Sequence, residues 1–170
     1  MSESSSVPHV VAAAAFTPSV RVARMMETLR VAEMVSRLPD AVYAPEVDPL
    51  LQQAGLESFF NCVRSLIEFL ELRRPKPSDF SATDVLPTWS PTVDAATSAR
   101  LQDDWLNASR QVMHFSKDRV RSEAGPAVEV PSDAASLHRM ADDVLGVWDQ
   151  YADQVGHPLC PKRADFSLWR

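Results

Sequence analysis

The chain has 170 residues, a formal net charge of −6 and a sequence pI of about 5.2. Hydrophobic residues make up 45% of it and charged residues 24%, which excludes an intrinsically disordered chain and is typical of a globular domain. The length suits a single hydrophobic core. The acidic balance argues against a general nucleic-acid binder, because only a local basic patch could hold a phosphate backbone.

The first predicted element is a helix over residues 18–38. Thr17 is a suitable N-cap, and Pro18 suits the first helical position, where its missing N–H costs nothing. Pro39 is expected to end this helix. One face carries apolar residues at helical spacing, namely Val22, Met25, Leu29, Ala32 and Val35.

The second predicted helix covers residues 49–73, with Asp48 as N-cap and Pro49 at the first position. A wide apolar stripe predicts a central place in the core; it consists of Leu56, Phe59, Phe60, Val63, Leu66, Ile67 and Leu70. A polar row lies on the remaining strip, because its members are three or four residues apart; they are Glu57, Asn61, Arg64 and Glu68.

A long Pro-rich loop, residues 75–93, follows, and we expect one helical turn near 81–85 and packing of Phe80 and Trp89 on the body. Helices are then predicted over 94–119 and 133–155. The stripe of the former contains Leu101, Trp105, Ala108, Val112 and Phe115, and that of the latter contains Leu137, Met140, Ala141, Val144, Trp148, Tyr151 and Val155.

These elements predict an all-α fold, a mostly antiparallel bundle of four main helices. Residues 1–8 are predicted to be a mobile tail, 9–156 a single helical-bundle domain, and 157–170 an apolar tail that docks on the body or on a partner. Because of that tail we expect a protein partner or self-association. The tail's apolar side chains are Phe166, Leu168 and Trp169.

Two cysteines, Cys62 and Cys160, are too few for a disulfide framework, which favours a reducing, cytoplasmic location. No apolar run approaches the length of a membrane span. The sequence contains no Glu-x-x-His pair, zinc spacing or glycine-rich phosphate loop, so we expect no metal and no cofactor.

The stretch "LNASRQVMHFSKDRVR", residues 106–121, contains the main candidate site. On a helical wheel Asp103, Asn107, Arg110 and His114 share one row, opposite the apolar stripe. A neutral imidazole can accept a proton, and a guanidinium can hold a phosphate, so His114 and Arg110 are candidate catalytic residues for metal-independent RNA cleavage. A basic cluster adds candidate binding residues, Lys117, Arg119 and Arg121. The simpler interpretation is that the row is a solvated helix face.

The two helical stretches "ESFFNCVRSLIEFLE" and "SRQVMHFSKDR", separated by the Pro-rich loop, resemble bacterial helical proteins of the HEPN superfamily over about residues 50–120. In that comparison His114 is followed five residues later by Arg119, and Arg64 and Glu68 match an arginine and an acidic position. The resemblance implies an all-α bundle, often dimeric, from RNA-processing, antiviral or toxin–antitoxin systems. Its ribonucleases place four to six residues between arginine and histidine, whereas only "QVM" separates Arg110 from His114.

Two functional hypotheses follow. The first is a non-catalytic HEPN-like interaction or ligand-binding module, favoured because the departure from the motif spacing is typical of lost activity. The second is a ribonuclease or toxin in which His114 is the base and Arg110 or Arg119 steadies the phosphate, with RNA as ligand. Asn107, Arg64 and Glu68 are candidate binding residues in either case, although the simpler and favoured interpretation of Arg64 and Glu68 is a structural salt-bridge row. If the row serves chemistry, Arg64 or Glu68 should lie within hydrogen-bond reach of it, because a positioned base needs an orienting partner.

Overall fold

The computed structural model describes residues 17–73, 76, 78–112 and 133–167. The predicted all-α fold is confirmed: the described part of the chain contains helices and no strand. Four main helices form the body, α1 (Pro18–Val42), α2 (Pro49–Phe69), α4 (Ala95–Val112) and α5 (Ala134–Val155); two short ones, α3 (Ala82–Val85) and the 3₁₀ helix η2 (Arg163–Asp165), complete it.

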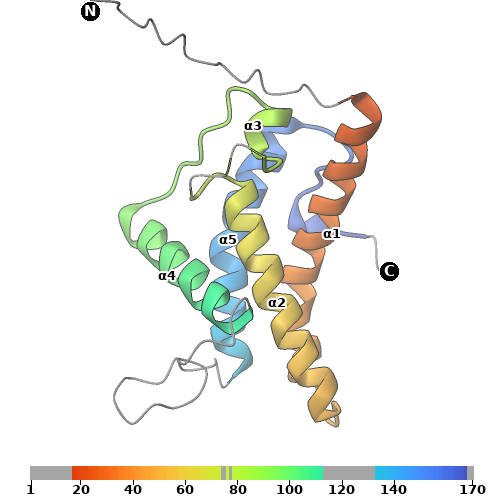
Figure 1. Ribbon diagram of the computed structural model, residues 1–170, viewed down its shortest axis with the longest axis vertical. Helices are drawn as coiled ribbons and strands as arrows, with labels where there is room; N and C mark the ends of the chain where they lie inside the picture. Colours follow the sequence, from red (N-terminus) through yellow and green to blue (C-terminus); the bar gives the residue numbers. More distant parts are fainter. Residues whose placement is uncertain (1–16, 74–75, 77, 113–132, 168–170) are drawn as a thin grey trace, which may run out of the picture.

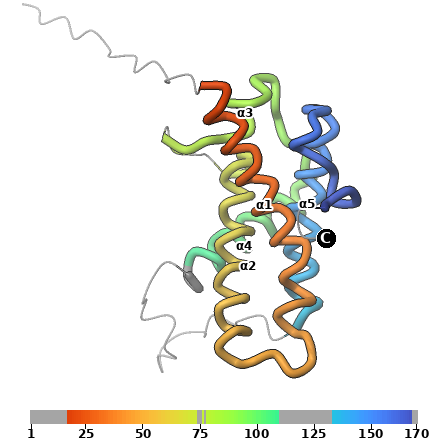
Figure 2. Tube along the Cα trace, turned by 90° about the vertical axis from the view of Figure 1, so that its right-hand side faces the viewer, coloured from red at the N-terminus to blue at the C-terminus, as the bar shows by residue number. Residues whose placement is uncertain are grey.

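α2 is the central helix of the bundle. It packs against α1 on one side and α4 on the other, while α5 packs mainly against α1. Figure 1 shows α1 and α2 running antiparallel beside α5, with α4 crossing them obliquely, and Figure 2 shows the tight turn that joins α1 to α2. In Figure 1, α3 and the start of α1 lie at the same pole of the bundle as the end of α5.

The predicted starts of α1 and α2 are confirmed. Pro18 and Pro49 occupy the first turns, and the carboxylate of Asp48 accepts hydrogen bonds from the Leu50 N–H (2.8 Å) and the Leu51 N–H (3.3 Å). At the other end of the chain Gly156 closes α5 with a φ of 58°, the left-handed conformation that glycine adopts without steric cost.

Two predicted helix ends were wrong. Pro39 does not end α1, which continues to Val42; the proline removes only one hydrogen bond of the helix, and its ring is buried in the last turns. α2 ends at Phe69 rather than 73, because Glu71 adopts a positive φ of 59° and turns the chain toward α3. There its carboxylate accepts the N–H of Thr83 at 3.0 Å. The predicted residues 113–119 of the third helix lie outside the described residues.

The core is built mainly from aromatic and aliphatic side chains of α2 and α5. Phe59, Trp148 and Tyr151 are fully buried, and the Phe69 ring meets that of Tyr151 edge-on at 5.3 Å. Trp89 is pinned as expected, since its indole N–H donates to the Leu70 carbonyl at 3.0 Å. Trp105, which the periodicity placed in the core stripe, is only partly buried.

The segment after α5 folds back along the bundle. The Trp148 indole N–H donates to the Pro161 carbonyl at 2.9 Å, Phe166 is buried, and the Ser167 N–H donates to the Glu33 carboxylate at 2.7 Å. The side chain of Phe166 therefore packs against its own chain. Leu168 and Trp169 lie outside the described residues, as do residues 1–16, which include the predicted N-terminal tail. No helix among the described ranges is long and apolar enough to cross a membrane.

Candidate functional site

The predicted pair Arg64 and Glu68 lies where α2 meets α4. One turn apart on α2, they form an ion pair with the Arg64 Nε donating to the Glu68 Oε1 at 3.2 Å. The same oxygen accepts the indole N–H of Trp105 from α4 at 3.0 Å. Glu68 therefore links two helices, and its polar contacts are of the kind that fix helix packing.

Trp105 is also covered by two guanidinium groups. The central carbon of Arg73 lies 3.4 Å from the centroid of the indole, and that of Arg64 lies 5.2 Å from it. The negative face of an indole attracts cations, so both contacts stabilise this junction. Arg73 was not among the predicted site residues; the sequence placed it at the end of the second predicted helix, whereas in the structure it follows the turn at Glu71 and lies against Trp105 of α4.

The described part of the structure does not place the remaining predicted site residues beside Arg64, Glu68 and Trp105. Asn107 is exposed on α4. The backbone of Arg110 belongs to α4, but its side chain is not among the described ones. Four candidates lie outside the described residues entirely: His114, Lys117, Arg119 and Arg121. The predicted row of Arg110 and His114 therefore stays a prediction.

A second polar network joins α4 to α5. Arg100 makes two hydrogen bonds to Asp143, of 2.7 and 2.8 Å, and Arg139 contacts Asp104 at 2.8 Å and Asp143 at 3.2 Å. The hydrogen bonds from Arg100 lower the pKa of Asp143. Burial raises the pKa of Asp104, whose exposed fraction is 3%, against the opposing effect of Arg139. This network clamps the two helices.

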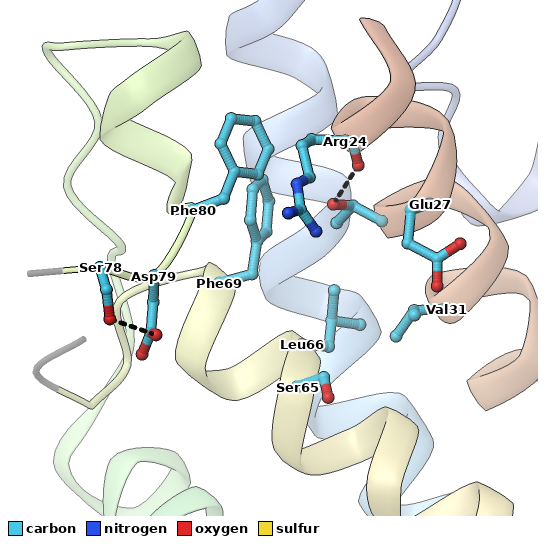
Figure 3. Close-up of a pocket in the computed structure, with 10 residues that line it drawn as sticks. Arg24, Glu27, Val31, Ser65, Leu66, Phe69, Ser78, Asp79 and Phe80 are labelled. Carbon is cyan, nitrogen blue, oxygen red and sulfur yellow. Dashed lines mark hydrogen bonds between the residues drawn. The ribbon is translucent and has the colours of Figure 1, made fainter. Parts of the chain in front are cut away.

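A groove that the sequence analysis did not identify lies between α1, α2 and residues 78–80. It encloses about 400 Å³. Its apolar part is made by Phe69 and Phe80, whose ring centroids are 5.8 Å apart, together with Val31 and Leu66. Figure 3 shows the side chain of Arg24 extending from α1 into the groove toward the two rings.

The charged side chains around this groove differ in whether they make hydrogen bonds or ion pairs. The Glu27 carboxylate is held by Arg30, whose hydrogen bonds lower the pKa of Glu27. Asp79 accepts the Lys76 N–H at 3.1 Å. The Arg24 guanidinium, in contrast, makes no hydrogen bond or ion pair with any residue that the structure describes; only its main-chain carbonyl is engaged, by the Thr28 hydroxyl at 2.8 Å. Arg24 thus places beside the apolar floor a guanidinium that makes no hydrogen bond to any described residue, although its charge also helps to lower the pKa of Glu27.

Nothing in the local sequence could have identified this groove. Arg24 lies on a helix whose pattern indicates only which face is buried, and Phe80 comes from a loop more than fifty residues away along the chain. Long-range packing of residues 78–80 against α1 and α2 creates the groove (Figure 3).

Within the described ranges no three His, Cys, Asp or Glu side chains are grouped so that they could hold a metal ion. Both cysteines are buried, and burial raises the pKa of each thiol to about 11. A thiol with so high a pKa is a poor nucleophile near neutral pH.

Comparison of the chain with protein-family models, with curated proteins and with solved structures finds no match.

Proposed function

We propose that this protein is a non-catalytic, HEPN-like helical interaction module, and that it binds a segment of a protein partner in the groove between α1, α2 and residues 78–80. The observation that carries the proposal is the guanidinium of Arg24, which makes no hydrogen bond to any described residue, beside the rings of Phe69 and Phe80 (Figure 3). The HEPN-like part rests on the sequence resemblance over about residues 50–120.

The groove has the chemistry of a protein-binding surface. An apolar or aromatic side chain of the partner would pack on Phe69 and Phe80, because such anchors supply most of the binding energy at interfaces. A carboxylate of the partner would pair with Arg24, whose planar fork suits bidentate binding of an acidic group. The partner segment is therefore one that carries an acidic residue close to an apolar one.

The arrangement of Arg64 and Glu68 supports binding over catalysis. Their side chains are hydrogen-bonded to each other, and Glu68 also to Trp105, so these groups join α2 to α4. A general base or a phosphate-binding arginine needs polar atoms directed at a substrate. The ribonuclease alternative thus depends on His114 together with Arg110 or Arg119.

Site-specific photocrosslinking tests the proposal. Ser65 lines the groove and is exposed, so we replace it by p-benzoylphenylalanine and irradiate the protein in extract of its source cells. The matched control carries the same crosslinker at Gln102, an exposed position of α4. We expect an adduct of defined mass from position 65 and none of that mass from position 102.

Charge reversal then tests the part played by Arg24. In the protein with the crosslinker at position 65, Arg24→Glu should abolish the adduct, since it would repel the acidic residue of the partner. Arg37→Glu makes the same charge change at another exposed position of α1 and should leave the adduct intact. The same adducts from positions 65 and 102, or an adduct that survives Arg24→Glu, would overturn the proposal.

A further inference from the structure

A second groove lies at the end of the bundle where α1 begins and α5 ends. Six of the residues that line it are Arg21, Val22 and Met25 of α1, Val85 of α3, and Val155 and His157 at the end of α5. Figure 1 shows these three elements at the same pole of the molecule. The groove encloses about 480 Å³, which is within the range of small-molecule sites.

The floor of this groove is apolar. Met25 belongs to the buried core, and Val85 and Val155 are partly buried against it. Val22, on the wall, keeps 44% of its surface exposed to solvent. A hydrocarbon group placed here would cover this apolar surface, which is the main source of affinity in such sites.

Two basic side chains line the same groove. Arg21 makes no side-chain hydrogen bond or ion pair with any residue in the described ranges; its N–H belongs to the first helical hydrogen bond, to Thr17. The Nδ1 atom of His157 accepts the Leu159 N–H at 3.1 Å. In the neutral ring the proton is therefore on Nε2, which leaves that atom as a hydrogen-bond donor.

The charges of the groove select the ligand. Among the described residues that line it there are two basic side chains and no carboxylate, so an acidic group is attracted and an ammonium group is repelled. We infer that this groove binds a small apolar carboxylate, with the acid group held by Arg21 and the Nε2–H of His157, and with the hydrocarbon body on Met25, Val85 and Val155. This site is distinct from the groove at Arg24 and its test does not depend on that one.

Titration of the full-length protein with octanoate, followed by calorimetry and by the methyl resonance of Met25, tests the inference. We expect saturable binding that shifts this resonance. Octylamine, which has the same chain and the opposite charge, should not bind. Failure of octanoate to bind, or equal binding of octylamine, would overturn the inference, as would a groove occupied by another segment of the chain.

Variants at the two basic positions identify the site. Arg21→Gln and His157→Ala should each weaken octanoate binding by about tenfold, because the first removes the positive charge and the second removes the Nε2–H donor to the charged acid group. Both positions are exposed, so we expect no loss of folding. Arg37→Gln removes the same charge from another exposed position of α1 and should leave the affinity unchanged. Equal affinity of Arg21→Gln and Arg37→Gln would show that the acid group is held elsewhere.

Discussion

The indole N–H of Trp105 donates to the same Glu68 oxygen that accepts Arg64, at 3.0 and 3.2 Å respectively. One carboxylate oxygen thus serves a contact within α2 and a contact between α2 and α4. A tryptophan held in this way, under the guanidinium of Arg73, stabilises the surface junction of two helices. Its role differs from that of a core residue, and the difference can be measured.

Replacing the two tryptophans by alanine should give unequal losses of stability. Trp148 is fully buried, so Trp148→Ala should lower the free energy of unfolding by about 3 to 5 kcal/mol. Trp105 is partly exposed, and Trp105→Ala should cost about 1 to 2 kcal/mol through the lost hydrogen bond and cation–π contacts. Urea melts of both variants provide the comparison. Equal losses would contradict the assignment of Trp105 to the surface junction.

The pairing of Arg100 with Asp143 predicts a specific dependence of stability on pH. The pKa of Asp143 is lowered from its ordinary value of 3.8, so the unfolded chain binds this proton more readily. The stabilisation is therefore complete above about pH 4 and is lost as the pH falls through the lowered pKa. Urea melts at several pH values should show that the free-energy gap between the wild type and Asp143→Asn is largest near neutrality and shrinks below pH 4.

A control for this measurement is Asp103→Asn, an exposed change on α4. The effect of Asp104 on the pH dependence of stability has the opposite sign to that of Asp143. Burial raises the pKa of Asp104, so its ionisation above pH 4 opposes folding. We therefore expect the free-energy gap between wild type and variant to shrink at low pH for Asp143→Asn and not for the control. A gap for Asp143→Asn that stays constant from pH 7 to pH 2, like that of the control, would refute the role given to the Arg100 ion pair.

Both thiols should resist modification in the folded protein. Cys62 and Cys160 are buried, and the pKa of each is about 11, so little thiolate is present at pH 8. With a chromogenic disulfide reagent we expect almost no reaction within minutes at pH 8 and release of two equivalents per chain in guanidinium chloride. Rapid reaction of one thiol in the native protein would mean that its surroundings open readily.

The ribonuclease alternative predicts an effect of His114→Ala that a binding module would not show. We expect the wild type and this variant to leave total cellular RNA intact and to have the same effect on growth when they are expressed. Gel analysis of the RNA, with melting temperatures to verify that both proteins are folded, makes the comparison. Cleavage by the wild type that the variant lacks would instead establish His114 as a catalytic residue.

The sequence alone determined the helical class and most of the helix positions, because these depend on local patterns. The apolar stripes at helical spacing, the prolines at positions 18 and 49, and the carboxylate of Asp48 act within one or two turns of the chain. The C-terminal ends of α1 and α2 were less predictable from the sequence. Pro39 is tolerated near the end of α1, and Glu71 ends α2 by taking a left-handed conformation and binding Thr83, a contact that the helical pattern does not encode.

Only the tertiary structure decided what the polar side chains contact. The periodicity placed Arg64 and Glu68 in one row, but it could not show that Trp105 would reach Glu68 or that Arg73 would lie on the indole. The two grooves likewise arise where segments far apart in the chain meet, Phe80 beside Arg24 and His157 beside Arg21. The physical reason is that helical spacing determines which residues share a face, whereas the partner of that face depends on the packing of the whole bundle.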